Sequence, residues 1–270
     1  MVKRITACFL ASATLVACST NPITGRKQLS LVSEREVQGM ATTQYRQFLS
    51  QSAVVSPSAD RDAEMVRRVG KRVANAITTY YRQQGLGSQL NGYNWEFNLV
   101  NDKQVNAWCM PGGKVVVYTG LLPVTRNEAA LAVVMGHEIA HAVLQHGRER
   151  MSQGLAQQLG GVALSAALAN RPAATQNLFL QSYGVASNVG VMLPFSRKQE
   201  FESDRYGLIF TAMAGYNPRE AVALWQRMEQ MSSGNRPPQF LSTHPTEGNR
   251  IEQLERYMPE ALKYYKPAGR

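Results

Sequence analysis

Cysteine is scarce in this chain, with three residues among 270. Cys8 lies within an N-terminal apolar stretch that has the features of a secretory signal, and Cys18 follows that stretch directly. Loss of the signal and modification of Cys18 would leave Cys109 as the only free thiol, which excludes an intramolecular disulfide even in an oxidising compartment. We expect Cys109 to be a small buried side chain; a redox or zinc-binding role is the alternative.

Long hydrophobic runs and internal repeats are also lacking. The apolar stretch of residues 5–17 is shorter than the roughly 20 residues that a membrane-spanning helix requires. Segment 152–195 is rich in Gly, Ala, Ser and Leu, but Arg171-Pro172 interrupts it and polar residues dilute its second half. For this segment we predict mobile helices over a cleft, as a lid, or else an ordinary core hairpin. No similarity at a period near 34 residues indicates a repeat domain.

Acidic residues are fewer than basic ones. The chain has 29 Lys and Arg against 19 Asp and Glu, a formal net charge of +10, and loss of Lys3 and Arg4 with the signal would lower it to +8. The basic residues are scattered, and an exported protein meets no nucleic acid, so nucleic-acid binding is excluded. The excess charge favours attraction to anionic lipid or acidic unfolded proteins, with a merely solvated surface as the alternative.

The first 30 residues predict export and a lipid anchor. Lys3 and Arg4 precede the apolar stretch, as in secretory signals. The sequence Leu15-Val16-Ala17-Cys18 resembles the bacterial lipobox, which implies cleavage before Cys18 and a lipid on its sulfur and new amino group; a chance cysteine is the alternative. Ser19 in place of Asp implies the periplasmic leaflet of the outer membrane. Such a protein is anchored to a membrane without spanning it.

Three of the four histidines fall within ten residues, and two of them form the string HEIAH. His137 and His141 are four residues apart, so on a helix their side chains lie about 40° apart and one turn along. Both imidazoles can then bind one zinc ion, and Glu138 lies beside it, where it can take a proton from the attacking water. The surrounding residues are apolar, so unpaired Glu and His would be costly in this helix. A metal site is therefore favoured over ordinary core or surface histidines.

A third ligand is expected about sixty residues downstream, in the sequence QEFESD. Glu200 and Asp204 share one helical face, whereas Glu202 points away from it. We therefore predict Glu200 as the ligand and Asp204 as the acceptor of a hydrogen bond from a zinc-bound imidazole. The alternative is a solvated acidic face with nearby basic partners, Arg197, Lys198 and Arg205.

The two remaining histidines have different expected roles. His146 lies about 180° round a continuous helix from His137, so it cannot reach the same metal and should flank a helix end at Gly147. His244 precedes Pro245, which is expected to open a helix with Arg250 in its second turn. His244 and Arg250 near a metal could stabilise the oxyanion of a tetrahedral intermediate; for His244 the alternative is a loop residue without a role.

Capping signals and periodicity predict several elements of a single domain over residues 31–270, after a short tether at 18–30. Ser33–Glu36 should be a capping box before a helix that runs to about Ser50. Asp60 should cap a second helix with apolar residues along one face, and Thr125–Glu128 should be another capping box that opens the HEIAH helix. The expected strands are Trp95–Val100 and Lys114–Tyr118, since the latter is β-branched and aromatic. A further helix should start at Asn217-Pro218 and run to Met231.

Taken together, these motifs resemble the HtpX/BepA/LoiP-type family of zinc metallopeptidases, the group that contains the CAAX prenyl proteases. HEIAH with the trailing His146, the Glu200–Asp204 element and Thr243-His244-Pro245 with Arg250 carry the resemblance. Asn106–Gly113, followed by Lys114–Tyr118 and Thr119–Leu122, resembles the family's substrate-side edge strand. In many relatives Ala replaces Ser203.

The resemblance implies an α+β, mostly helical gluzincin domain in which the edge of a small sheet lies beside the zinc-binding helix. It implies one Zn²⁺ per chain and a protease that binds extended peptides along that edge, near Asn106 and Ala107. It also implies that His244 binds zinc in a resting form of some relatives. The implied substrates are misfolded or stalled envelope proteins, with the outer-membrane assembly machinery as a further partner. The alternatives are a client-binding lipoprotein with little proteolysis and a zinc amidase of the cell wall.

Overall fold

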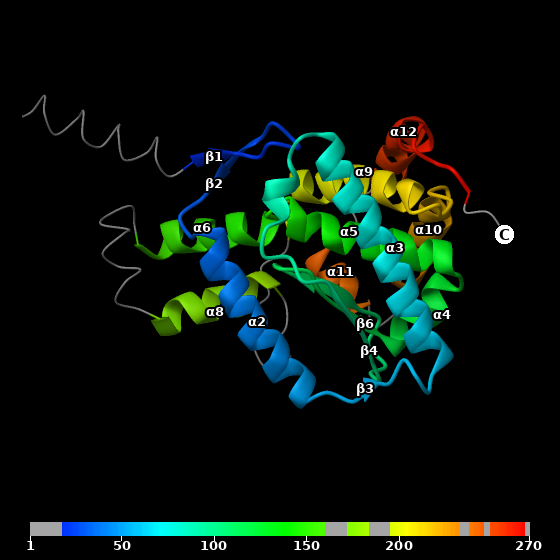
Figure 1. Cartoon of the computed structure of the whole chain (residues 1–270), viewed down its shortest axis with the longest axis horizontal. Helices are drawn as coiled ribbons and strands as arrows, with labels where there is room; N and C mark the ends of the chain where they lie inside the picture. Colours follow the sequence, from blue (N-terminus) through cyan, green and yellow to red (C-terminus); the bar gives the residue numbers. More distant parts are fainter. Residues whose placement is uncertain (1–17, 160–171, 184–194, 233–237, 246–248, 268–270) are drawn as a thin grey trace, which may run out of the picture.

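The structure, a computed structural model, describes residues 18–159, 172–183, 195–232, 238–245 and 249–267. The predicted signal, residues 1–17, and the central and final parts of segment 152–195 lie outside these residues. Helices surround a small sheet (Figure 1), which confirms the predicted mostly helical α+β fold. None of the helices in the described ranges combines the length and apolar character that a membrane span requires.

The main sheet has four strands in the order β3-β4-β6-β5. β4 runs parallel to β6, and β3 and β5 are antiparallel to their neighbours. The strands are β3 (Val54–Val55), β4 (Glu96–Val100), β5 (Ala107–Met110) and β6 (Lys114–Tyr118). The edge beside the HEIAH helix is therefore β5, whereas β6 is an interior strand. The assignment of Lys114–Tyr118 to the edge was wrong: its run of three valines is buried on both faces, as in a central strand.

The predicted caps place the first two long helices. The side chain of Ser33 accepts a hydrogen bond from Glu36 N at the start of α2 (Glu34–Ser50), and Asp60 accepts from two backbone N–H groups at the start of α3 (Arg61–Gln83). Both caps satisfy donors that the first helical turn leaves open. The apolar face of α3 is fully buried and packs on β4 and on the HEIAH helix, confirming that prediction.

Two helices, α5 (Glu128–Val143) and α9 (Arg197–Met213), lie side by side and form the most extensive contact between helices. α5 contains HEIAH and α9 contains Glu200. They approach closely because Gly136 meets Gly207 where they cross: a Cβ at Gly136 would lie 2.9 Å from the carbonyl oxygen of Gly207. The cap of α5 is Asn127, whose side chain accepts from Ala130 N. The predicted capping box at Thr125 was wrong, because Arg126 adopts a left-handed conformation (φ 66°) and Thr125 ends the preceding helix.

The remaining helices enclose this pair and the sheet. Short helical turns η1, η2 and α4 connect strands and helices, and α10 starts at Glu220, after a turn at the predicted Asn217-Pro218. Their bounds are η1 (Gly87–Leu90), η2 (Thr119–Leu121), α4 (Leu122–Thr125), α6 (His146–Leu159), α8 (Pro172–Tyr183), α10 (Glu220–Ser232), α11 (Gln239–Thr243) and α12 (Arg250–Leu262). α6 and α8 pack together, so the described parts of segment 152–195 include a helical pair.

The predicted tether contains a docked hairpin. β1 (Cys18–Thr20) pairs with β2 (Lys27–Leu29), and the side chains of Asn21 and Gln28 each donate a 2.9 Å hydrogen bond to the carbonyl oxygen of Leu144. Leu144 is the C-terminal cap of α5, where carbonyl groups lack helical donors. Residues 18–29 are therefore attached to the end of the HEIAH helix through the buried Asn21 and Gln28, while Cys18 lies exposed at the surface.

Candidate metal centre

The HEIAH residues lie in the buried middle of α5. His137, Glu138 and His141 are each 3% exposed. His137 Nε2 and His141 Nε2 lie 3.0 Å apart, so the two rings face one point, as the spacing of one helical turn predicts. The helix carries both imidazoles on the face that packs against α9 and the sheet.

α9 contributes two carboxylates to the same place. Glu200 Oε1 lies 3.3 Å from His141 Nε2, and Glu200 Oε2 lies 3.6 Å from His137 Nε2. One turn further, Asp204 Oδ1 lies 2.9 Å from His137 Nδ1. The structure thus brings together the predicted glutamate and both histidines, with Asp204 on the outer nitrogen of His137. The alternative of a solvated face is wrong for Glu200 and Asp204, which are 2% and 3% exposed.

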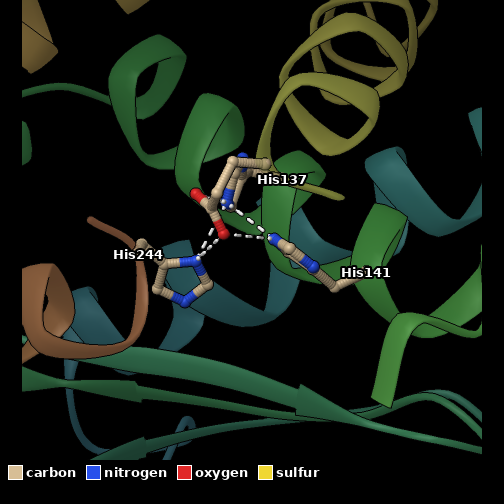
Figure 2. A group of neighbouring side chains, drawn as sticks. His137, His141 and His244 are labelled. Carbon is tan, nitrogen blue, oxygen red and sulfur yellow. Dashed lines mark hydrogen bonds and ion pairs between the residues drawn. The ribbon is translucent and has the colours of Figure 1, made fainter. Parts of the chain in front are cut away.

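His244 completes a group of four. It follows α11, and its Nδ1 lies 3.0 Å from Glu200 Oε1 and 3.2 Å from His137 Nε2, while its Nε2 lies 3.3 Å from Glu138 Oε1. Figure 2 shows the three imidazoles of His137, His141 and His244 directed toward one another. One ligand atom from each histidine and from Glu200 can be chosen so that all four lie within 4.8 Å of one another. His244 is 2% exposed and lies within this group, so it is not a solvated loop residue; its role stays a prediction.

The donor set fits zinc. His137 Nδ1 bonds a carboxylate, so the proton of this ring belongs on Nδ1 and the Nε2 lone pair faces His141 Nε2. Neutral imidazole nitrogens and a carboxylate oxygen converging in a buried pocket are typical zinc ligands. A cation bound between them would replace the repulsion of lone pairs that face each other with attraction. His137, His141, Glu200 and His244 would hold the ion.

Burial and charge act in opposite directions on the two glutamates. Burial opposes the ionisation of Glu200, but the charges of His244 and Arg250 outweigh it and hold the pKa of Glu200 well below its usual value. For Glu138 burial dominates, and the charges of His244 and His137 offset it only in part, so the pKa of Glu138 is raised. The ligand carboxylate is thus kept ionised and the neighbouring one is kept more basic, as a proton acceptor requires.

Arg250 lies behind the carboxylates. Its Nε and Nη2 donate to both oxygens of Asp204 at 2.9 and 2.8 Å, and its Nη1 lies 2.7 Å from Glu200 Oε2. The guanidinium also stacks on the ring of Trp225 at 3.5 Å. This geometry favours a role in holding Asp204 and Glu200; the predicted contact with an oxyanion stays a prediction. The helix α12 begins at Arg250, so the expected start at Pro245 was wrong.

The predicted substrate side borders the metal centre. A cavity of about 30 Å³ is lined by β5 on one side and by Glu138, His141 and His244 on the other. Asn106 and Ala107 both line it, and the Asn106 side chain accepts a hydrogen bond from Ala107 N at 3.0 Å. The volume is that of about one water molecule.

Phe195 and Arg150 are among the lining residues that were not predicted from the sequence. The ring of Phe195 lies 3.7 Å from that of His141 between centroids, and the guanidinium of Arg150 lies 3.3 Å from the centre of Phe195. Burial lowers the pKa of Arg150 to about 9. Phe195 is held in place by its N–H, which donates to the carbonyl oxygen of Thr243 at 3.1 Å. No motif marks either residue, because their positions depend on how α6 and Phe195, which precedes α9, pack against His141 of α5.

The trailing histidine lies outside the group of four, as predicted, but at a different kind of helix end. α5 ends at Val143, and Gln145, with φ 62°, turns the chain into α6, which begins at His146. The predicted stop at Gly147 was wrong: Gly147 lies inside α6, where a Cβ would lie 2.2 Å from the ring of Tyr183. The sharp turn directs His146 back toward His141.

Comparison with known proteins places this arrangement in a family. Residues 60–258 match Peptidase family M48, a range that contains the four converging residues, Asp204 and Arg250. The chain belongs to peptidase family M48. The matching range ends after the first turns of α12 and excludes the N-terminal hairpin.

Several named relatives of the chain are peptidases. It is 34% identical to the mitochondrial metalloendopeptidase OMA1 of Schizosaccharomyces pombe, across 89% of this chain and 66% of that protein. It is 32% identical to the mitochondrial metalloendopeptidase OMA1 of Homo sapiens, across 90% of this chain and 46% of that protein. It is 29% identical to the beta-barrel assembly-enhancing protease of Escherichia coli, across 58% of this chain and 33% of that protein. The chain thus spans two thirds or less of the length of these relatives.

Proposed function

We propose that this chain is a zinc-dependent endopeptidase whose active site is formed by α5, α9, the His244 loop and the edge strand β5. The observation that carries the proposal is the convergence of His137, His141 and Glu200, with Glu138 beside them and β5 along one side. Membership of peptidase family M48 and the metalloendopeptidase relatives support it. A zinc ion in this site supplies a Lewis acid that polarises the scissile carbonyl and acidifies water.

The residues of the chain then have separate tasks. β5 offers its backbone to an extended peptide, because it pairs with β6 on one side only among the described strands. Glu138 accepts the proton of the attacking water and passes it to the leaving amine. His244, which lies 3.3 Å from Glu138, is placed to stabilise the developing oxyanion once it moves away from Glu200. In the arrangement that the structure shows, His244 would instead be placed as a fourth ligand.

Replacing Glu138 by Gln tests the chemistry. The variant keeps the size of the side chain but cannot accept the proton, so we expect cleavage of unfolded casein to fall by about 10²–10⁴-fold. Zinc content should remain one per chain by elemental analysis. Glu128→Gln is the matched control, since it makes the same change on the first residue of the same helix, where Glu128 pairs with Arg68. A purified protein without stoichiometric zinc, or equal activity of wild type and Glu138→Gln, would overturn the proposal.

The same preparation distinguishes the other chemistries. We expect wild-type protein to cleave casein and to leave purified peptidoglycan intact, with all activity lost on chelation and restored by zinc. Release of cell-wall peptides without casein cleavage would identify an amidase. Protection of unfolded proteins from aggregation to the same extent by wild type and Glu138→Gln would identify a client-binding protein in which zinc is structural.

We further propose that the protein acts in the bacterial periplasm, attached to the outer membrane by a lipid on Cys18, on misfolded or stalled envelope proteins. The exposed position of Cys18 and the lipobox-like sequence support the anchor. The relative in E. coli is named a beta-barrel assembly-enhancing protease, which supports β-barrel proteins under assembly as clients; the outer-membrane assembly machinery as a partner is part of this proposal. Fractionation of wild type and Cys18→Ser tests the anchor: the variant should move from the outer-membrane fraction to the soluble periplasm, and equal distribution of both proteins would exclude it.

A further inference from the structure

The ring of His141 has a second contact on the side away from the metal centre. Its Nε2 faces Glu200 and His137, whereas its Nδ1 lies 3.1 Å from Nδ1 of His146. His146 is fully buried, and its ring meets the ring of His141 nearly edge to face, with the two ring centroids 5.0 Å apart. His146 therefore fills the place on His141 that Asp204 fills on His137.

The pairing allows one arrangement of protons when His141 binds a metal through Nε2. Its Nδ1 must then carry the proton and donate it to His146 Nδ1, which must be the acceptor. The proton of the neutral His146 ring consequently belongs on Nε2, where Glu202 Oε2 accepts it at 2.9 Å. The hydroxyl of Ser203 approaches the same His146 Nδ1 at 3.2 Å.

Glu202 is itself held by the N-terminal hairpin. Arg26, directly before β2, donates from Nε to Glu202 Oε1 at 2.8 Å and makes a bidentate pair with Glu149 at 2.6 and 2.7 Å. The two carboxylates and the guanidinium are largely buried, with side-chain exposures of 13% for Arg26, 6% for Glu149 and 15% for Glu202. Hydrogen bonds of this kind between charged groups are shorter and stronger than neutral ones.

We propose that Arg26, Glu202 and His146 are positioning residues that orient His141 for metal binding, so that the N-terminal hairpin is part of the metal centre. A series of hydrogen bonds runs from the Arg26 guanidinium to the Glu202 carboxylate, then to the His146 ring and finally to His141 Nδ1. It fixes the tautomer and the rotation of His141 and increases the basicity of its Nε2, as carboxylates beyond zinc-bound histidines do. The inference rests on the proposed role of His141 as a ligand.

The hairpin lies outside the part of the chain that matches the peptidase family, since that range begins at residue 60. Its side chains nevertheless reach the centre by two routes. Asn21 and Gln28 fix the carbonyl end of α5, and Arg26 fixes Glu202 on α9. Because the hairpin contacts both ligand-bearing helices, its loss would free the turn at Gln145 that directs His146 to His141.

Matched substitutions at His146 separate orientation from packing. His146→Asn retains an oxygen that can accept from His141 Nδ1, whereas His146→Leu has a similar size and no acceptor. We expect His146→Leu to lower zinc affinity by about 10–100-fold, with most of the affinity restored in His146→Asn. The measurement is competition of full-length apoprotein with a chromophoric chelator, together with the visible spectrum of the Co²⁺-loaded protein, which reports ligand geometry independently of activity.

Arg26→Ala tests the end of this series of hydrogen bonds that lies farthest from His141. It should weaken zinc binding less than His146→Leu and shift the Co²⁺ spectrum in the same direction. Arg205→Ala is the control. Arg205 lies on α9, the helix that carries Glu202, and makes a bidentate pair with Glu260 of α12 away from the metal centre. Thermal unfolding of each apoprotein identifies variants that are simply less stable.

The outcomes separate the inference from the function on which it rests. If wild type binds one zinc tightly and His146→Leu binds it equally well with an unchanged Co²⁺ spectrum, the positioning role is wrong and the proposed peptidase stands. Equal loss in His146→Asn and His146→Leu would show that His146 only fills space. If wild type itself binds no zinc, the proposed function fails. Should His146→Leu not fold, the comparison of Arg26→Ala with Arg205→Ala decides, and equal zinc affinity in these two would reject the inference.

Discussion

Each candidate ligand in this protein is held by a second polar side chain. Asp204 bonds the outer nitrogen of His137, and Arg250 bonds both Asp204 and Glu200. Isolated charges in such a buried place would be strongly destabilising, and removing one partner from a buried pair costs far more than breaking a pair at the surface. The acidic and basic groups of this core are therefore coupled, and a change in one carboxylate should alter the affinity of the site for the metal.

Asp204→Asn tests this coupling at the level of a single residue. The amide preserves the shape but removes the negative charge, so His137 becomes less basic and the ion pair with Arg250 is lost. We expect zinc affinity to fall by about 10–100-fold, measured by chelator competition. Asp62→Asn makes the same change at an exposed position of α3 and should have no effect. Unchanged affinity in Asp204→Asn would show that Asp204 does not support the ligand.

The two ligand-bearing helices depend on a close crossing. At Gly207 a Cβ would lie 2.9 Å from His137 N and 3.0 Å from His137 Cα, which are backbone atoms that cannot move aside locally. Glycine is therefore required at this point of α9, although it weakens a helix interior. The crossing sets the distance between HEIAH and Glu200.

Gly207→Ala should move α9 away from α5. We expect it to lower the free energy of unfolding by about 1–3 kcal/mol, the usual cost of overpacking, and to weaken zinc binding because Glu200 is carried away from His137. Chemical denaturation and chelator competition measure the two effects. In Gly39→Ala, the control, a Cβ on α2 meets nothing within 4 Å, so stability should rise by about 0.5–1 kcal/mol. Similar stabilities of the two variants would contradict the packing argument.

At the scale of the whole molecule, the metal centre connects segments that are distant in sequence. α5, α9 and the His244 loop each provide candidate ligands, and Arg250 at the start of α12 pairs with the carboxylates of Asp204 and Glu200. A metal that binds only the folded chain stabilises it in proportion to its free concentration relative to the dissociation constant. Zinc should accordingly contribute to global stability as well as to catalysis.

Thermal unfolding with and without zinc tests this. Free zinc at one hundred times its dissociation constant should add about 2.7 kcal/mol, which raises Tm by roughly 5–10 °C for a domain of this size. Differential scanning calorimetry of the apoprotein and the zinc-loaded protein provides the comparison. Glu200→Gln, which lacks the ligand carboxylate, should show a much smaller rise at the same zinc concentration. An equal rise would mean that zinc binds elsewhere.

Local signals predicted the helical framework well. The caps at Ser33 and Asp60, the apolar face of α3 and the spacing of HEIAH depend on neighbouring residues, and the structure confirms them. Two of the errors in helix bounds occurred where several signals compete within a few residues. Arg126 and Gln145 adopt left-handed conformations without being glycine, so the true helix ends differed from those that Thr125 and Gly147 suggested.

Helical and strand periodicity act over short distances, so the sequence alone determined the local groupings of residues. These are two histidines and a glutamate in one helical turn, an acidic pair at the same four-residue spacing, and a strand of valines. Only the tertiary structure decided which strand lies at the edge of the sheet and that Phe195 and Arg150 line the cavity. It also decided that Glu202, held by Arg26, bonds His146. These contacts join residues up to 176 positions apart, as between Arg26 and Glu202. Packing of α5 against α9 and docking of the hairpin determine them, and no local pattern encodes either.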